Sequence, residues 1–580
     1  MLKTRIEFIR DFMQKQVEFP AECQIESEAL PRGVNHGALT RMFACNRRDL
    51  RDLPTMTVDG REAKDLDDAV SLTTDSNACR HLFVHIADVS HYVRANTALD
   101  REAYARGNSY YLGETVLPML PHRLSDDLCS LNPDTDKLTL TVELIYDVDG
   151  NFCGGDVYES VIRSDLRAVY TDLYNYFGQG ELEDNLAYEK LSTGQLQNMP
   201  KKYRQLAPMI CLAKSLAAEL AHRRQQKGSI MFDLPELSFE FNEQHQPVFA
   251  GKHEITWANR LIEEFMIAAN EFVAAYAQEH EIPIVYRTHG LPEADKFTAF
   301  LTLARSLNAK MPRHFNNLTR LQPKDVSRFL ELNEEHPAFT TLQTMLLRSQ
   351  AKAVYQKEPA GHFGLALADY CHFTSPIRRY SDLLTHRALK NYWHNRSNRR
   401  LAKHLAETCS YISEQERNAI VMERDVDAML SAEYMHNFIG VDYTAKISGF
   451  VQHGLFLSLD NAIEGFLAFK NLADHFVFLP EKMQAVGMRS HTVLRLGESL
   501  KVELSAVNLE SYLIDFIPLD PYLGKKPVKN KSKKALKKAI IKTKKESSKS
   551  ASKSTKAKSK AKAKVKFKGA NKAPKQRKLR

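Results

Sequence analysis

The pattern of apolar and polar positions changes twice along the chain. From about Thr55 apolar residues alternate with polar ones, as in KLTLTVELIYDVDG (137–150), where the alternation stops at an Asp-Gly turn. Such alternation is typical of half-buried β-strands. Between about residues 200 and 440 the apolar residues instead recur at helical spacing, which predicts a mainly helical region. The clearest helical stretches are 258–277, 341–355 and 401–438.

Short apolar stretches separated by glycine turns return at 442–518. A segment of about 75 residues with this pattern suits a small five-stranded barrel. We therefore expect an α+β fold in four parts. These are an N-terminal helix and linker (1–48), a domain of mixed sheet and helices (49–440), a small β-barrel (441–520) and a tail (521–580).

Composition narrows the class of protein. With 43% hydrophobic and 26% charged residues, the 580-residue chain has the composition of a soluble globular protein. No run approaches 18 uncharged apolar residues, so we expect no transmembrane helix and no membrane partner. The first residues, MLKTRIEFIRDFMQKQ, mix charges with apolar residues at helical spacing and do not resemble a secretion signal. Eight cysteines without a C-x-x-C pair predict reduced thiols in a cytoplasmic protein.

Charge is distributed very unevenly. From Lys525 to Arg580 there are 25 lysines and arginines and one acidic residue, Glu546, whereas the preceding residues carry 56 basic and 70 acidic side chains. The tail has few large apolar residues, so we expect it to be disordered. A tail of this kind usually binds a polyanion, here RNA, although it could also serve only solubility.

An acidic window, DGREAKDLDDA (59–69), contains the first candidate chemistry. On an extended chain Asp65 and Asp67 project to one side, Asp68 joins them if the chain bends, and Asp59 can fold back at Gly60. Carboxylates this close stay ionised together only beside a cation. Mg²⁺ suits such oxygen ligands, and the spacing of a calcium-binding EF-hand loop is not met. The alternative is a loop whose aspartates cap helices and bind water.

A second stretch, HFTSPIRRYSDLLTHR (372–387), offers a partner for this window. Ser375 at an N-cap and Pro376 at the first helical position predict a helix start, which favours an anion. Arg378 in the same turn adds a planar donor suited to phosphate. With Arg379 it could equally be a common surface pair. Opposite a metal cluster, however, these groups would complete a phosphodiester site.

Six segments that carry these residues resemble the ribonuclease II/ribonuclease R (RNB) family, in the family's order. They are TVDGREAKDLDDAV, HIADVSHYV, LPMLPHRLSDDLCSLNP, GSIMFDLPE, NRLIEEFMIAAN and HFGLALADYCHFTSPIRRYSDLLTHR. With the connecting chain they cover roughly residues 49–438, and the stretch ending near Pro518 is similar to an S1-type OB-fold. The Lys-rich tail is more like that of ribonuclease R. The resemblance implies an RNB-type domain and a processive 3′→5′ exoribonuclease that hydrolyses single-stranded RNA to nucleoside 5′-monophosphates.

The family's functional residues match positions of this chain one by one. The family's four active-site aspartates correspond to Asp59, Asp65, Asp67 and Asp68. This match implies a site for two Mg²⁺ ions. Among them, Asp67 matches the residue on which activity depends most. Arg378 matches the arginine that contacts the scissile phosphate. Tyr111 matches the tyrosine that packs on the 3′-terminal nucleotide, and its neighbour Tyr110 would point the other way on a strand.

Two further matches are less specific. Glu263 and Glu264 lie where the family has a glutamate near the ribose, and helical geometry does not say which one faces RNA. In the S1-like part, Phe456 could stack on a base, whereas Phe450 could do so or belong to the barrel core.

The chain also departs from the family. Fewer than 60 residues precede Asp59, too few for the usual N-terminal cold-shock domains. We therefore expect weaker capture of RNA but unchanged chemistry, in a protein that acts as a monomer. The competing hypothesis is an RNA-binding protein that has the nuclease fold without turnover.

Overall fold

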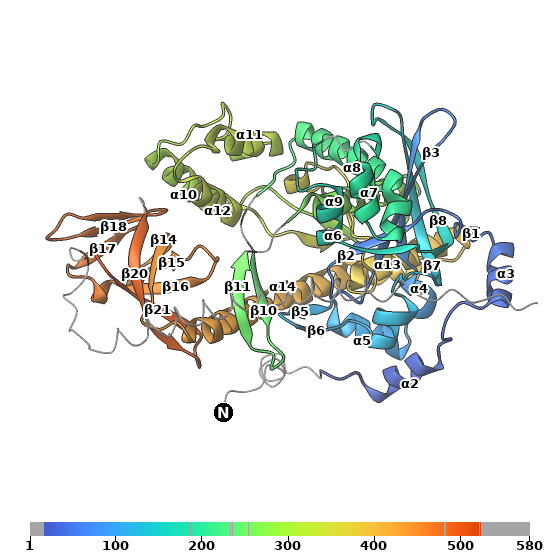
Figure 1. Ribbon diagram of the computed structural model, residues 1–580, viewed down its shortest axis with the longest axis horizontal. Coiled ribbons are helices and arrows are strands. Elements are labelled where there is room, and N and C mark those ends of the chain that lie inside the picture. The colour runs from blue at the N-terminus through green and yellow to red at the C-terminus, as the bar shows by residue number, and fades with distance from the viewer. Residues whose placement is uncertain are drawn as a thin grey trace, which may run out of the picture.

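The computed structural model describes residues 17–184, 188–232, 234, 236–252, 255–480, 483–520 and 523. Apart from Leu523, the predicted disordered tail (521–580) lies outside these residues. In Figure 1 a barrel stands at one end of the molecule and a large sheet with its helices at the other, and one long helix joins them. Among the described residues, no helix is long and apolar enough to cross a membrane.

A seven-stranded mixed sheet is the centre of the larger part, with strand order β1-β8-β7-β4-β3-β2-β9. Its strands are β1 (Arg48–Asp49), β2 (Met56–Asp59), β3 (Asp68–Thr74), β4 (Arg80–Ala87), β7 (Asp136–Tyr146), β8 (Phe152–Arg163) and β9 (Leu166–Val169). The β3-β4-β7-β8 pairs are antiparallel, and β1 and β9 are added in parallel. The strand predicted at 137–150 is confirmed, but its half-burial is wrong: Thr139 and Thr141 are buried as fully as the apolar residues from Leu138 to Leu144.

Helices cover both faces of this sheet (Figure 1). One face packs on α6 (Tyr170–Phe177), α8 (Lys201–Lys227) and α9 (Trp257–Glu279). The other packs on α4 (Val89–Tyr92), α5 (Ala98–Arg106) and α13 (Tyr380–Trp393). The smaller elements are α2 (Ala21–Ala29), α3 (His36–Ala44), α7 (Thr193–Asn198), β5 (Tyr110–Leu112), β6 (Thr115–Leu117), β10 (Leu237–Phe241) and β11 (Pro247–Lys252). Two helices, α2 and α3, thus occur in the described part of 1–48, where the sequence predicted one.

Three helices form a separate layer around a phenylalanine-rich core: α10 (Ala294–Ser306), α11 (Pro323–Asn333) and α12 (Phe339–Ser349). The helix predicted for 341–355 is wrong in its last residues, since α12 ends at Ser349. Residues Val354–Gln356 form β13, which pairs with β12 (Tyr286–Thr288). Strand pairing with a distant segment here overrides the helical spacing of the sequence.

The long helix α14 (Arg399–His436) leads into the barrel, close to the predicted 401–438. The barrel is closed, with strand order β14-β15-β16-β21-β20, which confirms the five-stranded prediction. Its strands are β14 (Asp442–Val451), β15 (Gly454–Ser458), β16 (Glu464–Ala468), β20 (Ser499–Asn508) and β21 (Leu513–Pro518). A small sheet of β17 (Phe476–Leu479), β18 (Gln484–Gly487) and β19 (Val493–Arg495) extends from it.

Candidate active site

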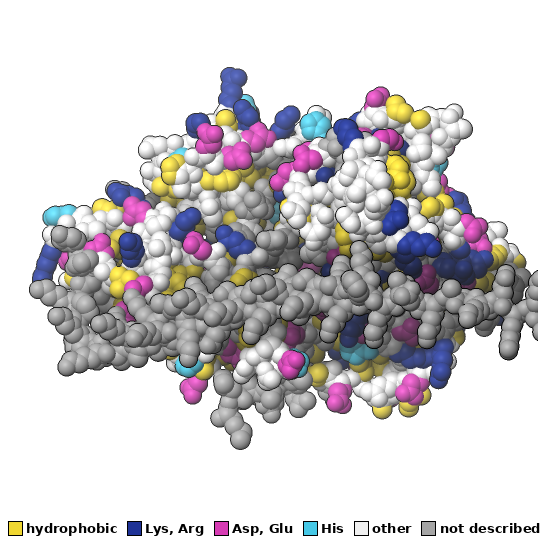
Figure 2. Space-filling model, in the orientation of Figure 1, with side chains coloured by type: hydrophobic (Ala, Val, Ile, Leu, Met, Phe, Trp, Pro, Cys, Tyr) yellow, Lys and Arg dark blue, Asp and Glu magenta, His cyan; other side chains and the backbone are white. Residues whose placement is uncertain are grey.

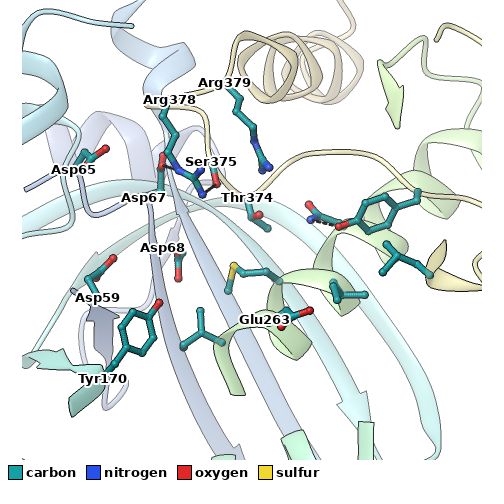
Figure 3. Close-up of a pocket in the computed structure, with 16 residues that line it drawn as sticks. Asp59, Asp65, Asp67, Asp68, Tyr170, Glu263, Thr374, Ser375, Arg378 and Arg379 are labelled. Atoms are coloured by element: carbon teal, nitrogen blue, oxygen red, sulfur yellow. Dashed lines mark hydrogen bonds and ion pairs between the residues drawn. The ribbon is translucent and has the colours of Figure 1, made fainter. Parts of the chain in front are cut away.

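The four aspartates of the acidic window line one cavity of about 370 Å³. Asp59 is the last residue of β2 and Asp68 the first of β3, and the segment between them carries Asp65 and Asp67. Arg378 and Ser375 line the same cavity. Figure 3 shows Arg378 reaching down toward Asp67, with Asp68 and Asp59 deeper in the site. The two stretches singled out from the sequence, more than 300 residues apart, therefore meet here.

The carboxylate of Asp67 is tied to the second stretch. Its Oδ1 accepts a hydrogen bond of 2.8 Å from the backbone N–H of Ile377, and its Oδ2 lies 3.3 Å from Nε of Arg378. Arg378 is also held by its own turn, because its Nη2 donates to Oγ of Ser375 at 2.8 Å. A buried anion thus fixes the arginine at the rim of the cavity, with its side chain 41% exposed.

The helix start predicted at Ser375 is wrong. Residues 376–378 form a turn, Arg379 is extended, and α13 begins at Tyr380. The turn does not continue because the N–H of Tyr380 donates to the carbonyl oxygen of Gly107 instead of to its own turn. The sequence also predicted that this segment favours an anion. In the structure a backbone N–H of the turn, that of Ile377, donates to the carboxylate of Asp67.

Burial and mutual repulsion make these carboxylates poor anions without a cation. Burial and the neighbouring Asp68 and Asp65 raise the pKa of Asp59 to about 8. Burial raises the pKa of Asp68 to about 6 and also raises that of Asp67, against the opposing effect of Arg378. Oδ2 of Asp59 is buried without a hydrogen-bond partner, and Oδ2 of Asp67 has only the ion pair with Arg378. Such oxygens are the ligands that Mg²⁺ prefers.

The donor set therefore fits a hard divalent cation, although its side chains are not yet gathered around one point. Among the described residues, no three His, Cys, Asp or Glu side chains converge closely enough to hold an ion as they stand. Ion binding would require some of these carboxylates to change side-chain rotamer and turn toward one point.

Tyr111 lies beside the aspartates, at the edge of the site. It is 40% exposed, and its hydroxyl donates a hydrogen bond of 2.7 Å to Oδ2 of Asp65. Tyr110, the next residue on β5, is buried in a cluster with α14. The two side chains thus point in opposite directions, as the alternation along a strand predicted.

The two glutamates of α9 have different surroundings. Glu264 is buried and accepts hydrogen bonds of 3.0 and 3.2 Å from Nε of Arg224. The side chain of Glu263 is 57% exposed and lines the aspartate cavity (Figure 3). The structure thus answers what helical geometry left open: of the two, Glu263 faces the site.

Comparisons with known proteins agree with this geometry. The RNB domain model matches residues 47–395. The chain belongs to the RNB domain family. It is 37% identical to ribonuclease R of Aquifex aeolicus over 503 residues, 86% of this chain and 68% of the relative, and 34% identical to ribonuclease R of Escherichia coli over 506 residues, 84% and 60%. The chain thus spans about 60 to 68% of these relatives' length.

Among solved structures, RNase R of Mycoplasma genitalium in complex with ribose-methylated single-stranded RNA superposes with a TM-score of 0.80 at 27% identity. The match covers 89% of this chain and 78% of that one. The family resemblance predicted from the sequence is confirmed, and with it the α+β fold and the class of enzyme, a 3′→5′ exoribonuclease acting on RNA.

Sequence reasoning missed two aromatic side chains of the RNB site, Tyr170 and Tyr370. Tyr170, the first residue of α6, lines the cavity beside Asp59 (Figure 3). Parallel pairing of β2 with β9 places Asp59 opposite Val169, and so brings the next residue to the site. Burial and the carboxylates of Asp68 and Asp59 raise the pKa of the Tyr170 hydroxyl. No local pattern around Tyr170 signals this position, which depends on the pairing of distant strands.

On the barrel, the two phenylalanines separate. Phe456 on β15 is 39% exposed, with its ring 5.5 Å from that of Phe466. Phe450 is buried and stacks on Phe478, so it belongs to the barrel core. Phe456 remains the candidate for stacking on a base.

Proposed function

We propose that this chain itself hydrolyses single-stranded RNA from the 3′ end, processively, and releases nucleoside 5′-monophosphates. One observation carries the proposal: four aspartates and Arg378 line a single cavity, where a buried carboxylate oxygen of Asp59 has no hydrogen-bond partner and one of Asp67 has only the ion pair with Arg378. A site of this kind neutralises a phosphodiester from one side by cations and from the other by a guanidinium.

We assign a role to each side chain from its position in the site. Arg378, held by Ser375 and Asp67, would donate to the scissile phosphate and keep it over the carboxylates. Tyr111 would pack on the 3′-terminal base, since its ring is exposed and lines a neighbouring cavity that Arg378 also lines. Glu263, on the opposite wall, would accept a hydrogen bond from a ribose hydroxyl.

The cofactor in this proposal is a pair of Mg²⁺ ions. The residues that would hold them are Asp59, Asp65, Asp67 and Asp68. Bound there, the ions would supply an activated water and neutralise charge on the phosphate oxygens. Asp67 would be the least replaceable ligand, because its other oxygen already fixes the turn that carries Arg378.

RNA is the proposed partner of the other parts as well. Phe456 would offer a stacking face on the barrel, and the 25 basic residues between Lys525 and Arg580 would contact phosphates along the strand or another polyanion. Contacts of that kind weaken as salt rises, because binding releases counterions. We propose a cytoplasmic monomer.

The test uses single-stranded RNA labelled at its 5′ end, with Mg²⁺ or with EDTA. We expect the labelled RNA to shorten stepwise, nucleoside 5′-monophosphates to accumulate, and EDTA to stop both. A protein that only holds RNA would retain the strand without forming mononucleotides, and this outcome would reject the proposal. Endonucleolytic fragments in place of stepwise shortening would reject the 3′→5′ direction.

A further inference from the structure

The aspartate cavity has a neighbour, a cavity of about 190 Å³ that Tyr111 lines. Residues of β5, of α14 and of the turn before α13 form the walls of this second cavity, called here the Tyr111 cavity. Of the described residues that line either cavity, only Arg378 and Arg379 line both. The two arginines therefore stand at the junction of the aspartate cavity and the Tyr111 cavity.

Arg379 is held at this junction in the same way as Arg378, by a buried carboxylate on the protein side. Nη2 of Arg379 donates a hydrogen bond of 2.7 Å to Oδ1 of Asp382, which is fully buried. The same oxygen accepts a bond of 2.8 Å from the backbone N–H of Ser375, the residue whose hydroxyl binds Arg378. Figure 3 shows the two arginine side chains pointing into the site from one segment, on either side of Ser375. Asp382 thus does for Arg379 what Asp67 does for Arg378.

The guanidinium of Arg379 keeps donors for a further acceptor. Of its three nitrogens, Nη2 alone makes a hydrogen bond to another described residue, and the buried Nε has none. A buried donor without a partner costs folding free energy, so native proteins contain few of them. The side chain is nevertheless 20% exposed, at the two cavities. An acceptor that arrives with a ligand would satisfy these donors.

Charge indicates what kind of ligand this is. The guanidinium groups of Arg378 and Arg379 repel each other, and like charges in a partly buried site are poorly screened. A phosphate on the cavity side attracts both groups, and its oxygens match their planar donors. The junction therefore suits one phosphate held by two arginines.

We propose that Arg379 is a second phosphate-binding residue, which holds the scissile phosphate of RNA together with Arg378, and that Asp382 is its positioning residue. The inference rests on the proposed function, because that function makes the 3′ end of RNA the ligand. With the terminal base packed on Tyr111 in one cavity and the preceding nucleotide in the aspartate cavity, the linkage between them crosses the junction. Both arginines reach it there.

The test removes single charges from the RNA as well as from the protein. Three strands of one sequence are compared: one with natural linkages, one with an uncharged methylphosphonate at the 3′-terminal linkage, and one with it at the next linkage. All three carry 2′-O-methyl ribose before these linkages, which keeps a methylphosphonate stable. Binding is measured in EDTA, and the penalty is the loss of affinity that a methylphosphonate causes.

We expect the terminal methylphosphonate to weaken binding to the unmodified chain by about tenfold. In Arg379→Gln this penalty should shrink by about threefold or more, because one of its two partners is missing. Arg396→Gln, at an exposed arginine, is the matched control and should keep the full penalty. An unchanged penalty in Arg379→Gln would overturn the proposal, as would a penalty that shrinks only at the next linkage. Cleavage does not enter this measurement, so a chain that binds RNA without cleaving it gives the same answer.

A double variant separates phosphate binding from a role in the fold alone. Arg379→Gln leaves Asp382 buried without its partner's charge, which destabilises a protein. Combined with Asp382→Asn, both charges are gone and an oxygen remains for the N–H of Ser375. We expect the double variant to unfold closer to the temperature of the unmodified chain than Arg379→Gln does, and to keep the reduced penalty. A full penalty that returns with the stability would give Arg379 a structural role only and overturn the proposal.

Discussion

The backbone N–H of Ile377 donates a hydrogen bond of 2.8 Å to Oδ1 of Asp67, across 310 residues of sequence. This one bond holds both the carboxylate of Asp67 and the turn that carries Arg378 in place. An asparagine at position 67 keeps an oxygen that can accept the bond but loses the charge. We therefore expect Asp67→Asn to lower the cleavage rate by about two to three orders of magnitude, the scale on which single electrostatic contacts in active sites act.

The fold should survive this change, because burial raises the pKa of Asp67 so that its carboxyl group is largely neutral without metal, and an amide of the same shape still accepts the bond from Ile377. We expect thermal unfolding of metal-free Asp67→Asn to match the unmodified chain or to occur at higher temperature. Asp52→Asn, at an exposed position, is the control and should leave both rate and stability unchanged. Full activity of Asp67→Asn would remove Asp67 from the site.

Substitution by glutamine should affect different properties at the two neighbouring glutamates of α9: the stability of the fold at Glu264 and the binding of RNA at Glu263. Glu264→Gln leaves Arg224 buried without its partner's charge, and loss of one member of a buried ion pair costs about 3–5 kcal/mol. Glu263→Gln removes an exposed charge at the cavity, so stability should change by less than about 0.5 kcal/mol while KM for RNA rises. Denaturant unfolding and steady-state kinetics on both variants measure the difference. A drop in stability for Glu263→Gln, with kinetics unchanged, would contradict this assignment.

Local patterns predicted most of the fold and the acidic half of the site. The apolar alternation of β7, the helical spacing of α9 and α14, and the turns of the barrel all arise from neighbours in sequence, and the structure shows them at nearly the expected residues. The four aspartates could be found because they lie within one window of eleven residues.

Contacts between distant segments decided the rest. The helix expected at Ser375 fails because the N–H of Tyr380 donates to Gly107, a contact that no feature near Ser375 indicates. Tyr170 reaches the cavity only through the pairing of β2 with β9. Arg224 decides which α9 glutamate is buried, and it belongs to a different helix.

Tyr111 offers a test of base packing separate from chemistry. Its hydroxyl donates a hydrogen bond to Asp65, and its exposed ring lines a second cavity that shares Arg378 with the aspartate cavity. Tyr111→Ala should weaken RNA binding by about 1–3 kcal/mol, the usual value of one base stacked on an aromatic side chain, whereas Tyr111→Phe should retain most of the affinity. Binding is measured in the Asp67→Asn background, where RNA stays intact. Tyr188→Ala, at another exposed tyrosine, is the control, and an equal loss in all three variants would contradict a specific role for Tyr111.

Metal binding and pH should be coupled at the aspartate cavity. In the metal-free fold the pKa values of Asp59 and Asp68 are about 8 and about 6, above the value of about 3.9 in an unfolded chain. The folded state therefore holds protons that the unfolded state releases, so the stability contributed by these groups is complete below about pH 4 and is lost as pH rises toward 8.

Mg²⁺ binds the deprotonated carboxylates and should offset this loss. We expect the rise in melting temperature caused by Mg²⁺, relative to EDTA, to be larger at pH 8 than at pH 6. Asp59→Asn should reduce that difference, because it removes the group with the higher pKa, whereas Asp52→Asn should not. A melting temperature that does not respond to Mg²⁺ at either pH would show that these carboxylates do not hold the ion.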